Sequence, residues 1–537
     1  MPIDAVREPF TDEERRRLAP FFTDLEGPVF ALVNLPEVTK GALFARYSRS
    51  AKSLRRLFLD EFLEQAEEVA GPAAEEVGAA RAERLYERVF LEYGDDSVAQ
   101  LGGVHLACEQ SSQILAKVLE WGRLAAYLEQ STRYVPYDDR PGGRFRYTVP
   151  SEVATSPLGE RYRRTLDASF EAYSRWLEPM QAWFAHRTPR DPGDSDVVYR
   201  STIRARACDA LRGLLPAAVR TNVGIYATGQ AYEQLLLRMR ASPLEEVRGY
   251  ADLMLGELRK VIPAFLTRVD LHDRGVAWSG YLAETRERTR EVGAKLLDGL
   301  HPDPRPEVML TDHDPDGEVK VAAAALYAGS TLPDDRLMQA ARDMSAEERG
   351  AVLEAYVGER TDRRHKPGRA FERTDYRFDV LCDYGAFRDL QRHRLLTIEW
   401  QQLSPAHGYE VPSEVEESGA LEDFRRVMDA SASLHDELVA EGLAEVAPYA
   451  VAMAYRIRFV MQVNAREAMH LIELRSGPQG HPAYRRVAQD MHRLIQEVHP
   501  GIASAMRFVD LTDPSGASRL EAERRTEARR QALEAGA

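Results

Sequence analysis

Hydrophobic and polar residues follow one another along the chain in an order of elements that occurs twice. Residues 28–50 (PVFALVNLPEVTKGALFARYSRS) predict a short apolar strand, a turn marked by a proline and then a helix. Residues 306–330 (PEVMLTDHDPDGEVKVAAAALYAGS) predict the same features in the same order. Tyr47 and Tyr327, which lie 280 positions apart, occupy corresponding places in the two segments. This correspondence indicates an internal duplication.

The elements that follow also occur once in each half. A segment of alternating apolar and polar residues predicts a half-buried strand, and a helix-like stretch comes after it. A long helical segment then closes each half. The corresponding pairs are 104–110 and 376–381 for the strands, 112–123 and 385–394 for the first helices, and 222–262 and 455–498 for the long helical segments.

The boundary between the halves is predicted from a stretch rich in Pro and Asp, residues 298–308. We therefore expect two domains, 1–300 and 301–537. The first half carries an additional segment of irregular character between about 136 and 200. The C-terminal residues 518–537 are charged and rich in alanine, which is typical of a solvated helix or a frayed tail.

Composition and charge narrow the class of protein. A hydrophobic content of 44% and a charged content of 29% are typical of a soluble globular protein. We find neither a signal peptide nor an apolar run long enough to span a membrane, so we expect a cytoplasmic protein without a membrane partner. The net charge of -15 disfavours a nucleic-acid partner, because phosphate backbones bind to basic surfaces.

Neither the cysteines nor the acidic run at 312–317 predicts a metal site. Cys108, Cys208 and Cys382 lie far apart without C-x-x-C spacing, so we expect reduced cysteines in the core. The run DHDPDG at 312–317 is similar to the start of a calcium loop. Ala323, however, stands where such a loop places a bidentate glutamate, so we expect a turn.

A polar cluster in the first half carries candidate binding chemistry. Glu129, Ser131 and Arg133 follow an apolar helical run. Glutamate and serine can bind sugar hydroxyls, and an arginine can bind a phosphate through two parallel hydrogen bonds. A helix end with ordinary polar caps is the alternative interpretation.

A second polar cluster lies in the second half. Arg392, His393 and Arg394 stand together just after an apolar stretch. Two guanidinium groups beside an imidazole suit a polyanion or an electron-rich ring. A solvated cluster of charges is the alternative interpretation.

Together the two clusters resemble the flavin-dependent thymidylate synthases, which have an Arg-His-Arg signature followed by a loop similar to Glu-Gln-Ser-x-Arg-Tyr. The first half matches the loop, but it has Trp121, Gly122 and Arg123 in place of Arg-His-Arg. The second half matches Arg-His-Arg at 392–394, but Gln402 stands where the loop serine belongs.

Other segments continue the resemblance. VNAREAMHLIELRS in the second half is similar to the family segment that contacts flavin and ends in an arginine against the pyrimidine. LRGLLP in the first half resembles an Arg-x-x-Leu-Pro contact to the nucleotide, and GDDS is the remnant of an upstream motif. The matching residues of these segments are Asn464, Arg466, His470, Arg475, Arg212 and Ser97.

The pattern of loss predicts how the halves cooperate. By resemblance, each family site is built between two subunits, and each half of this chain keeps the set of motifs that the other half has lost. One whole site per chain is therefore expected. The resemblance implies an α+β fold of two such domains, each an antiparallel sheet flanked by long helices, arranged as a pseudo-dimer. Since the family is tetrameric by resemblance, we expect a homodimer of the fused chains.

The implied reaction converts dUMP to dTMP, with methylenetetrahydrofolate as carbon donor and NADPH-reduced FAD as hydride source. Arg475 is the implied catalytic residue, because it would lie against the pyrimidine. The implied dUMP contacts are Glu129, Ser131, Arg133, Arg212, Arg392 and Arg475. The implied FAD contacts are Ser97, Glu129, Arg392, His393, Arg394, Asn464, Arg466 and His470.

One departure from the family leaves an alternative open. Asp389 stands three residues before Arg392, where the family has a glutamine near the nucleotide. A carboxylate beside an anionic substrate is unfavourable unless it is protonated or turned away. A non-catalytic protein that binds a nucleotide or a flavin on the same fold is therefore the second hypothesis. A structural protein that binds nucleic acid fits the acidic charge poorly.

Overall fold

The computed structural model describes residues 9–27, 30–47, 52–63, 100–190, 195–301, 303–513 and 524. The chain divides into two compact units. The first comprises Met1–Glu109, Leu124–Glu129 and Asn222–Leu300, and the second comprises Gln110–Arg123, Gln130–Thr221 and His301–Ala537. The second unit therefore contains parts of both sequence halves. Within the described ranges, every helix is too short or too polar to cross a membrane.

In the first unit, three short helices pack around aromatic side chains. They are α1 (Asp12–Leu18), α2 (Glu37–Tyr47) and α3 (Leu54–Glu61). Thr11 and Glu14 form a capping box at the start of α1, which satisfies N–H groups that a first helical turn leaves unpaired. The ring of Phe58 contacts the rings of Phe21 and Phe22 in the core of this cluster.

Most of a three-stranded sheet also lies in the first unit, with strand order β1–β3–β2. Its strands are β1 (Gly103–Ser112), β2 (Ala125–Glu129) and β3 (Arg220–Thr228). β2 runs antiparallel to β3, with Leu128 opposite Gly224. Helices α10 (Gly229–Arg240), α11 (Glu245–Leu258) and α12 (Ala277–Leu296) follow β3.

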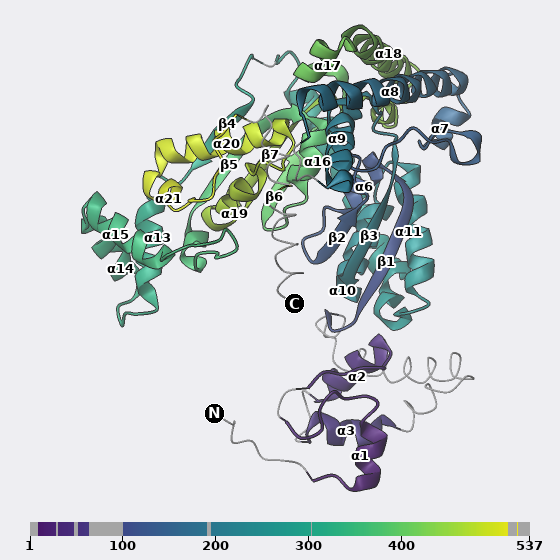
Figure 1. Ribbon diagram of the computed structural model, residues 1–537. Helices are drawn as coiled ribbons and strands as arrows, with labels where there is room; N and C mark the ends of the chain where they lie inside the picture. Colours follow the sequence, from purple (N-terminus) through teal and green to yellow (C-terminus); the bar gives the residue numbers. More distant parts are fainter. Residues whose placement is uncertain are drawn as a thin grey trace. The chain divides into compact units, whose positions relative to one another are not determined.

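The second unit is built on a four-stranded antiparallel sheet with the order β4–β5–β7–β6. The strands are β4 (Val308–His313), β5 (Asp375–Asp383), β6 (Leu396–Trp400) and β7 (Arg456–Asn464). Alternate residues of β7 are buried, because successive side chains of a strand point to opposite faces. Helices α16 (Tyr384–Gln391), α19 (Ala465–Arg475) and α20 (Pro482–Val498) pack against the strands, and Figure 1 shows α19 and α20 beside β5 and β7.

Corresponding elements of the two halves lie next to each other within the second unit. Trp176 of α8 (Gly159–Arg187) donates a hydrogen bond to Asp423 of α18 (Leu421–Ala440) at 2.9 Å. Gln391 of α16 donates to a backbone carbonyl of α6 (Gln113–Leu119). Residues 213–218 and 449–454 pair through antiparallel backbone hydrogen bonds. The other helices of this unit are α6 (Gln113–Leu119), α7 (Ser151–Ala154), α8 (Gly159–Arg187), α9 (Asp196–Leu211), α13 (Gly317–Tyr327), α14 (Asp334–Asp343), α15 (Ala346–Val357), α17 (Ser413–Ser418), α18 (Leu421–Ala440) and α21 (Pro500–Ser504).

Several local predictions are confirmed. The alternating segments at 104–110 and 376–381 lie in β1 and β5, and helices α6 and α16 follow them. The acidic run at 312–317 contains the turn between β4 and α13 (Gly317–Tyr327), in which the Asp314 carboxylate accepts a hydrogen bond from the backbone N–H of Asp316 (3.0 Å). Helices together with antiparallel strands agree with the expected α+β class.

The predicted long helical segments are wrong in their first part. Residues 222–228 and 456–464 are strands rather than helices. Both stretches alternate buried and exposed side chains, which is the two-residue period of a half-buried strand. Helices α10 and α19 begin only after Thr228 and Asn464, whose side chains cap the first helical turns.

The segment between 136 and 200 is not irregular, because it contains α8, a helix of 29 residues. Pro179 lies inside this helix, although an internal proline usually breaks a helix. The buried face nevertheless follows a helical period of three or four residues through Tyr162, Leu166, Phe170, Tyr173, Leu177, Met180 and Phe184.

The apolar strand predicted near the start of the first half is also wrong for the residues that the structure describes. Between 30 and 35, only Leu32 forms an isolated bridge, with Phe22. Phe30, Leu32 and Leu35 pack against the helical cluster instead, so their apolar character serves a helical core and not a sheet. The predicted tail at 518–537 lies outside the described residues except for 524.

Candidate functional site

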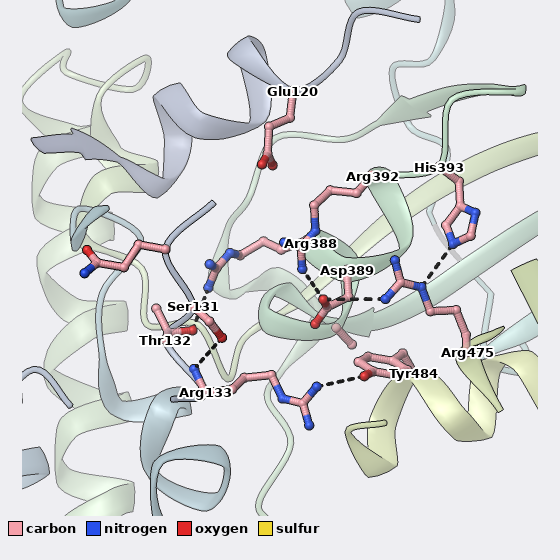
Figure 2. A network of polar contacts seen from close by, with 12 residues as sticks. Glu120, Ser131, Thr132, Arg133, Arg388, Asp389, Arg392, His393, Arg475 and Tyr484 are labelled. Carbon is pink, nitrogen blue, oxygen red and sulfur yellow. Dashed lines mark hydrogen bonds and ion pairs between the residues drawn. The ribbon is translucent and has the colours of Figure 1, made fainter. Parts of the chain in front are cut away.

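Arginine side chains from both sequence halves surround the carboxylate of Asp389. Arg392 forms an ion pair with it, and Arg475 Nη1 lies 3.7 Å from Oδ1 (Figure 2). Arg212 Nη1, from the first half, lies 3.8 Å from Oδ2. We call these three residues and Arg133, which lies close by, the arginine cage.

Three cage arginines are positioned by helix C-termini. Arg212 is the C-cap of α9, Arg392 is the C-cap of α16, and Arg475 is the last residue of α19. The backbone carbonyl groups at a helix C-terminus carry partial negative charge, which favours a cation there. The three helix ends therefore offset part of the repulsion between guanidinium groups brought to one place.

Asp389 is ionised although it is buried. Burial raises the pKa of its carboxyl group, but the positive charges of Arg392, Arg475, Arg133 and Arg212 outweigh burial and hold the pKa well below its usual range. The carboxylate would tolerate a bound anion if it were protonated or turned away from the cage. It is ionised and faces the cage arginines, so it disfavours an anion there.

Arg133 is held from several sides. Its Nε and Nη2 donate to both carboxylate oxygens of Asp209 at 2.7 and 2.9 Å, a bidentate geometry. Its Nη1 donates to the hydroxyl of Tyr484 at 2.8 Å, as Figure 2 shows. The side chain of Ser131 accepts a hydrogen bond from the Arg133 backbone N–H (3.2 Å) and shapes the turn that carries it.

Tyr484 of α20 contacts arginines of both halves. The guanidinium carbon of Arg133 lies 5.7 Å from the centre of the Tyr484 ring, and that of Arg475 lies 5.5 Å from it. Cations at this distance are attracted by the ring. One aromatic side chain thus joins the first-half loop to the end of α19.

His393 is buried behind Arg475 and is neutral. Arg475 Nε donates to His393 Nε2 at 3.0 Å, and His393 Nδ1 lies 3.0 Å from a carboxylate oxygen of Glu467. Since arginine only donates, Nε2 carries the lone pair and the ring proton is on Nδ1, facing Glu467. Burial, followed by Arg475 and Arg392, lowers the pKa of His393 well below its usual value.

A second set of cations lies around His393, Glu467 and His470. Potential ligand atoms of these three residues lie within 4.8 Å of one another, as in a metal site. The positive charge of Lys366, however, lowers the pKa of all three groups, and that of Arg394 lowers the pKa of His393 and Glu467. Burial lowers the pKa of His470 to about 4, with Lys366 contributing. So much positive charge suits an anionic group better than a metal cation.

The remaining predicted flavin contacts have structural partners. Asn464 caps α19 by accepting from the Glu467 N–H at 2.9 Å. Arg466 donates to the Pro367 carbonyl at 2.8 Å and pairs with Glu372 at 3.2 Å. Arg394 is exposed after α16. Glu129 ends β2 in the first compact unit, and Ser97 lies outside the described residues.

A second cage would need the Arg-His-Arg motif in the first half and the loop in the second half. Within the described residues, these mirror positions hold no arginine cluster. Trp121 stands where Arg-His-Arg would begin, and its ring lies 5.3 Å from that of Trp400. Arg123 donates to the hydroxyl of Thr397 at 2.9 Å. Gln402, in place of the loop serine, donates to the Ala444 carbonyl at 3.0 Å.

Sequence reasoning missed three residues of the site. Arg388 is buried and donates to the Thr132 hydroxyl at 3.3 Å. Tyr484 lies outside every motif that the sequence analysis used, and Lys366 was not singled out by any of them. Arg388 falls one turn before Arg392 on the same helix, and this spacing could have identified it. The sequence carries no comparable signal for Tyr484.

A cavity of about 140 Å³ is lined in part by Arg212, Asp383, Glu410 and His481. Arg212 Nη2 lies 3.6 Å from Asp383 Oδ1. Burial, followed by the charge of Asp383, raises the pKa of Glu410 to about 7. Arg486 pairs with Glu410 at 2.8 Å.

The three cysteines are free and buried, as expected. Burial raises the pKa of Cys108 and of Cys208 to about 11, and it raises the pKa of Cys382 further. A thiolate nucleophile is therefore disfavoured at each position.

Comparison with known proteins places the chain in a family. The model of the thymidylate synthase complementing proteins matches residues 42–264 and 307–501, so the chain belongs to this family and carries one matched segment in each half. It is 38% identical over 524 residues to a UPF0159 protein of Chlamydia muridarum, covering 97% of this chain and 99% of that protein.

More distant relatives include another UPF0159 protein and an enzyme that is named for its activity. The chain is 30% identical to a UPF0159 protein of Thermoplasma acidophilum over 90% of this chain and 98% of the relative. It is 27% identical to a flavin-dependent thymidylate synthase of Geobacter sulfurreducens over 36% of this chain and 84% of that enzyme. The shorter match agrees with a chain that contains the family domain twice.

Proposed function

We propose that the chain is a flavin-dependent thymidylate synthase that converts dUMP to dTMP in one site composed from its two halves. Methylenetetrahydrofolate would supply the carbon, and FAD reduced by NADPH would supply the hydride. The single observation that carries this proposal is the arginine cage. Arg133 and Arg212 from the first half meet Arg392 and Arg475 from the second half around one point.

The cage would bind the nucleotide through its charges. Arg133 and Arg212 would hold the phosphate, with Ser131 in the same turn, because guanidinium groups bind phosphate with paired donors. Arg392 would complete the contact from the second half.

Arg475 would act on the pyrimidine. Its guanidinium is oriented by His393 Nε2 and by Asp389 before any ligand arrives. A fixed positive charge of this kind stabilises negative charge that develops on the ring during reaction without further reorganisation. Arg475 would thus be the catalytic residue of the site.

The cations around His393 and His470 fit a flavin dinucleotide. The diphosphate of FAD needs several positive charges and hydrogen-bond donors, and Lys366, Arg394 and Arg466 supply them. Asn464, His393, Arg392 and His470 would complete the contacts. When bound, FAD supplies the hydride chemistry that no side chain can supply.

The same proposal arranges the two domains, residues 1–300 and 301–537, as a pseudo-dimer. Its support is that corresponding elements lie together in the second unit, α8 with α18, α6 with α16, and 213–218 with 449–454. A pairing of equivalent surfaces is what a twofold axis produces. We propose further that two chains form a homodimer, and light scattering that gives one chain's mass at micromolar concentration would contradict this.

A spectroscopic experiment tests the proposed function. Purified protein is reconstituted with FAD, and its visible absorbance is followed after NADPH is added with and without dUMP. Bleaching of the flavin band, and dTMP formed once methylenetetrahydrofolate is present, are the expected results. Flavin that binds but is never reduced would favour a non-catalytic flavin-binding protein. Failure to take up FAD would contradict both.

A further inference from the structure

Asp389 places a negative charge inside the cage that would bind the nucleotide phosphate. Its side chain is 8% exposed and contacts Arg392, Arg475 and Arg212 at once. Its pKa lies well below the usual range, so the charge is present at neutral pH. An anion that enters the cage therefore meets a carboxylate that already uses the same guanidinium groups.

The other cage contacts show that Asp389 is not needed to hold most of these arginines. Arg133 is gripped by Asp209 through two hydrogen bonds, and Arg475 donates to His393 Nε2. Arg212 Nη2 lies 3.6 Å from Asp383 Oδ1. Each of these partners contacts one arginine of the cage, whereas Asp389 lies against three of them.

We propose that Asp389 is a resident anion that competes with the phosphate of the ligand for the arginine cage. It is a specificity-determining residue, because it lowers the affinity for anionic ligands and leaves the affinity for the uncharged nucleoside unchanged. This inference rests on the proposed function in so far as the ligand is a nucleoside monophosphate. The competition itself requires only an anion of phosphate type.

Two substitutions separate charge from shape. Asp389→Asn removes the negative charge with little change in size, and Asp389→Glu keeps the charge and serves as the matched control. Calorimetry is performed with inorganic phosphate, dUMP and deoxyuridine on the full chain and on both variants. Circular dichroism and thermal unfolding confirm that each variant is folded.

We expect Asp389→Asn to bind phosphate and dUMP about tenfold more tightly than the wild type, because a like charge a few ångströms away is removed. Deoxyuridine affinity should be the same in both, and Asp389→Glu should bind phosphate as weakly as the wild type. Unchanged or weaker phosphate binding by folded Asp389→Asn would overturn the inference and show that Asp389 only positions the arginines.

A structure of the wild-type protein with dUMP or phosphate gives a test that no variant can confound. The ion pair between Asp389 and Arg392 should be broken when the anion occupies the cage. An anion bound in the cage with this pair intact would overturn the inference. If phosphate shows the expected gain in Asp389→Asn but dUMP binds to neither protein, the inference stands and the proposed function fails. If the wild type converts dUMP but Asp389→Asn binds phosphate no more tightly, the proposed function stands and the inference about Asp389 fails.

Discussion

Arg133 and Arg475 lie 342 positions apart in the sequence, yet both guanidinium groups contact the ring of Tyr484. If they serve one site, Arg133→Ala and Arg475→Ala should each lower dUMP affinity by about 10- to 150-fold. Each substitution removes one charge-assisted contact worth roughly 1.5–3 kcal/mol. Calorimetry and steady-state kinetics on the two variants measure the effect.

Arg123→Ala is the matched control for this prediction. Arg123 is exposed, belongs to the degenerate positions, and donates to Thr397 away from the cage. Its removal should leave dUMP affinity and turnover close to those of the wild type. A folded Arg123→Ala protein without activity would show that the halves are paired in another way.

Glu410 makes stability depend on pH near neutrality. Its pKa rises on folding to about 7 from an unfolded value of about 4.3, because it is buried and faces Asp383. The folded state therefore binds more protons between these two values, and the free energy of unfolding should fall as pH rises from about 4.5 to about 7. Glu410→Gln should remove this pH dependence. The free energy of unfolding of the variant should therefore rise by about 2 kcal/mol relative to that of the wild type as the pH increases from about 5 to about 8. Urea unfolding at several pH values measures it, and parallel curves for the two proteins would contradict the assignment.

At the scale of elements, a buried ion pair joins a loop to α19. Arg360 donates to both carboxylate oxygens of Glu473 at 2.8 and 2.7 Å, and also to the carbonyl of His365 at 2.6 Å. The same loop carries Lys366, which is one of the cations around His393. Arg360→Ala should lower the free energy of unfolding by about 3 kcal/mol, because it leaves a buried carboxylate unpaired.

Hydrogen exchange shows whether the loss is local. Amides of residues 361–373 should exchange faster in Arg360→Ala than in the wild type, as the loop loses its anchor. Arg369→Ala removes an exposed pair with Glu372 in the same loop and should leave the free energy of unfolding nearly unchanged, because solvent screens an exposed ion pair. Equal losses from the two substitutions would show that the buried pair does not hold the loop.

The sequence predicted elements well where one period dominated and poorly where two signals competed. The alternating strands in β1 and β5 were found, because their two-residue period is clear. β3 and β7 were not, because a helix follows each strand directly and its longer period dominated the window. α8 was missed although its buried residues recur with a helical period. Tertiary packing decided all three cases.

The candidate site was predictable only in part for a related reason. Resemblance to short family motifs singled out Arg133, Arg212, Arg392 and Arg475, since each belongs to a local pattern. The contacts of Asp389 with arginines from separate helices depend on how α9, α16 and α19 meet. Such contacts between residues distant in sequence leave no local pattern, and Tyr484 is missed for the same reason.

At the scale of the whole molecule, the duplication predicts how many ligands one chain binds. The first-half loop and the second-half helix ends form one cage, whereas the mirror positions hold a Trp121–Trp400 contact and a hydrogen bond from Gln402 to a backbone carbonyl. An aromatic pair offers no charge to a phosphate. Each chain should therefore bind one dUMP and not two.

Titration calorimetry with the full chain and FAD measures this number directly. The wild type should give a stoichiometry of one dUMP per chain, and Arg123→Ala should keep it, because the mirror positions do not bind. Arg133→Ala and Arg475→Ala should each weaken that single binding event, since the two arginines belong to one site. Two equivalent events per wild-type chain would mean that the mirror positions also bind the nucleotide. If either variant weakened only one of two binding events, the mirror positions would again have to bind the nucleotide. The proposed composite site would be wrong in both cases.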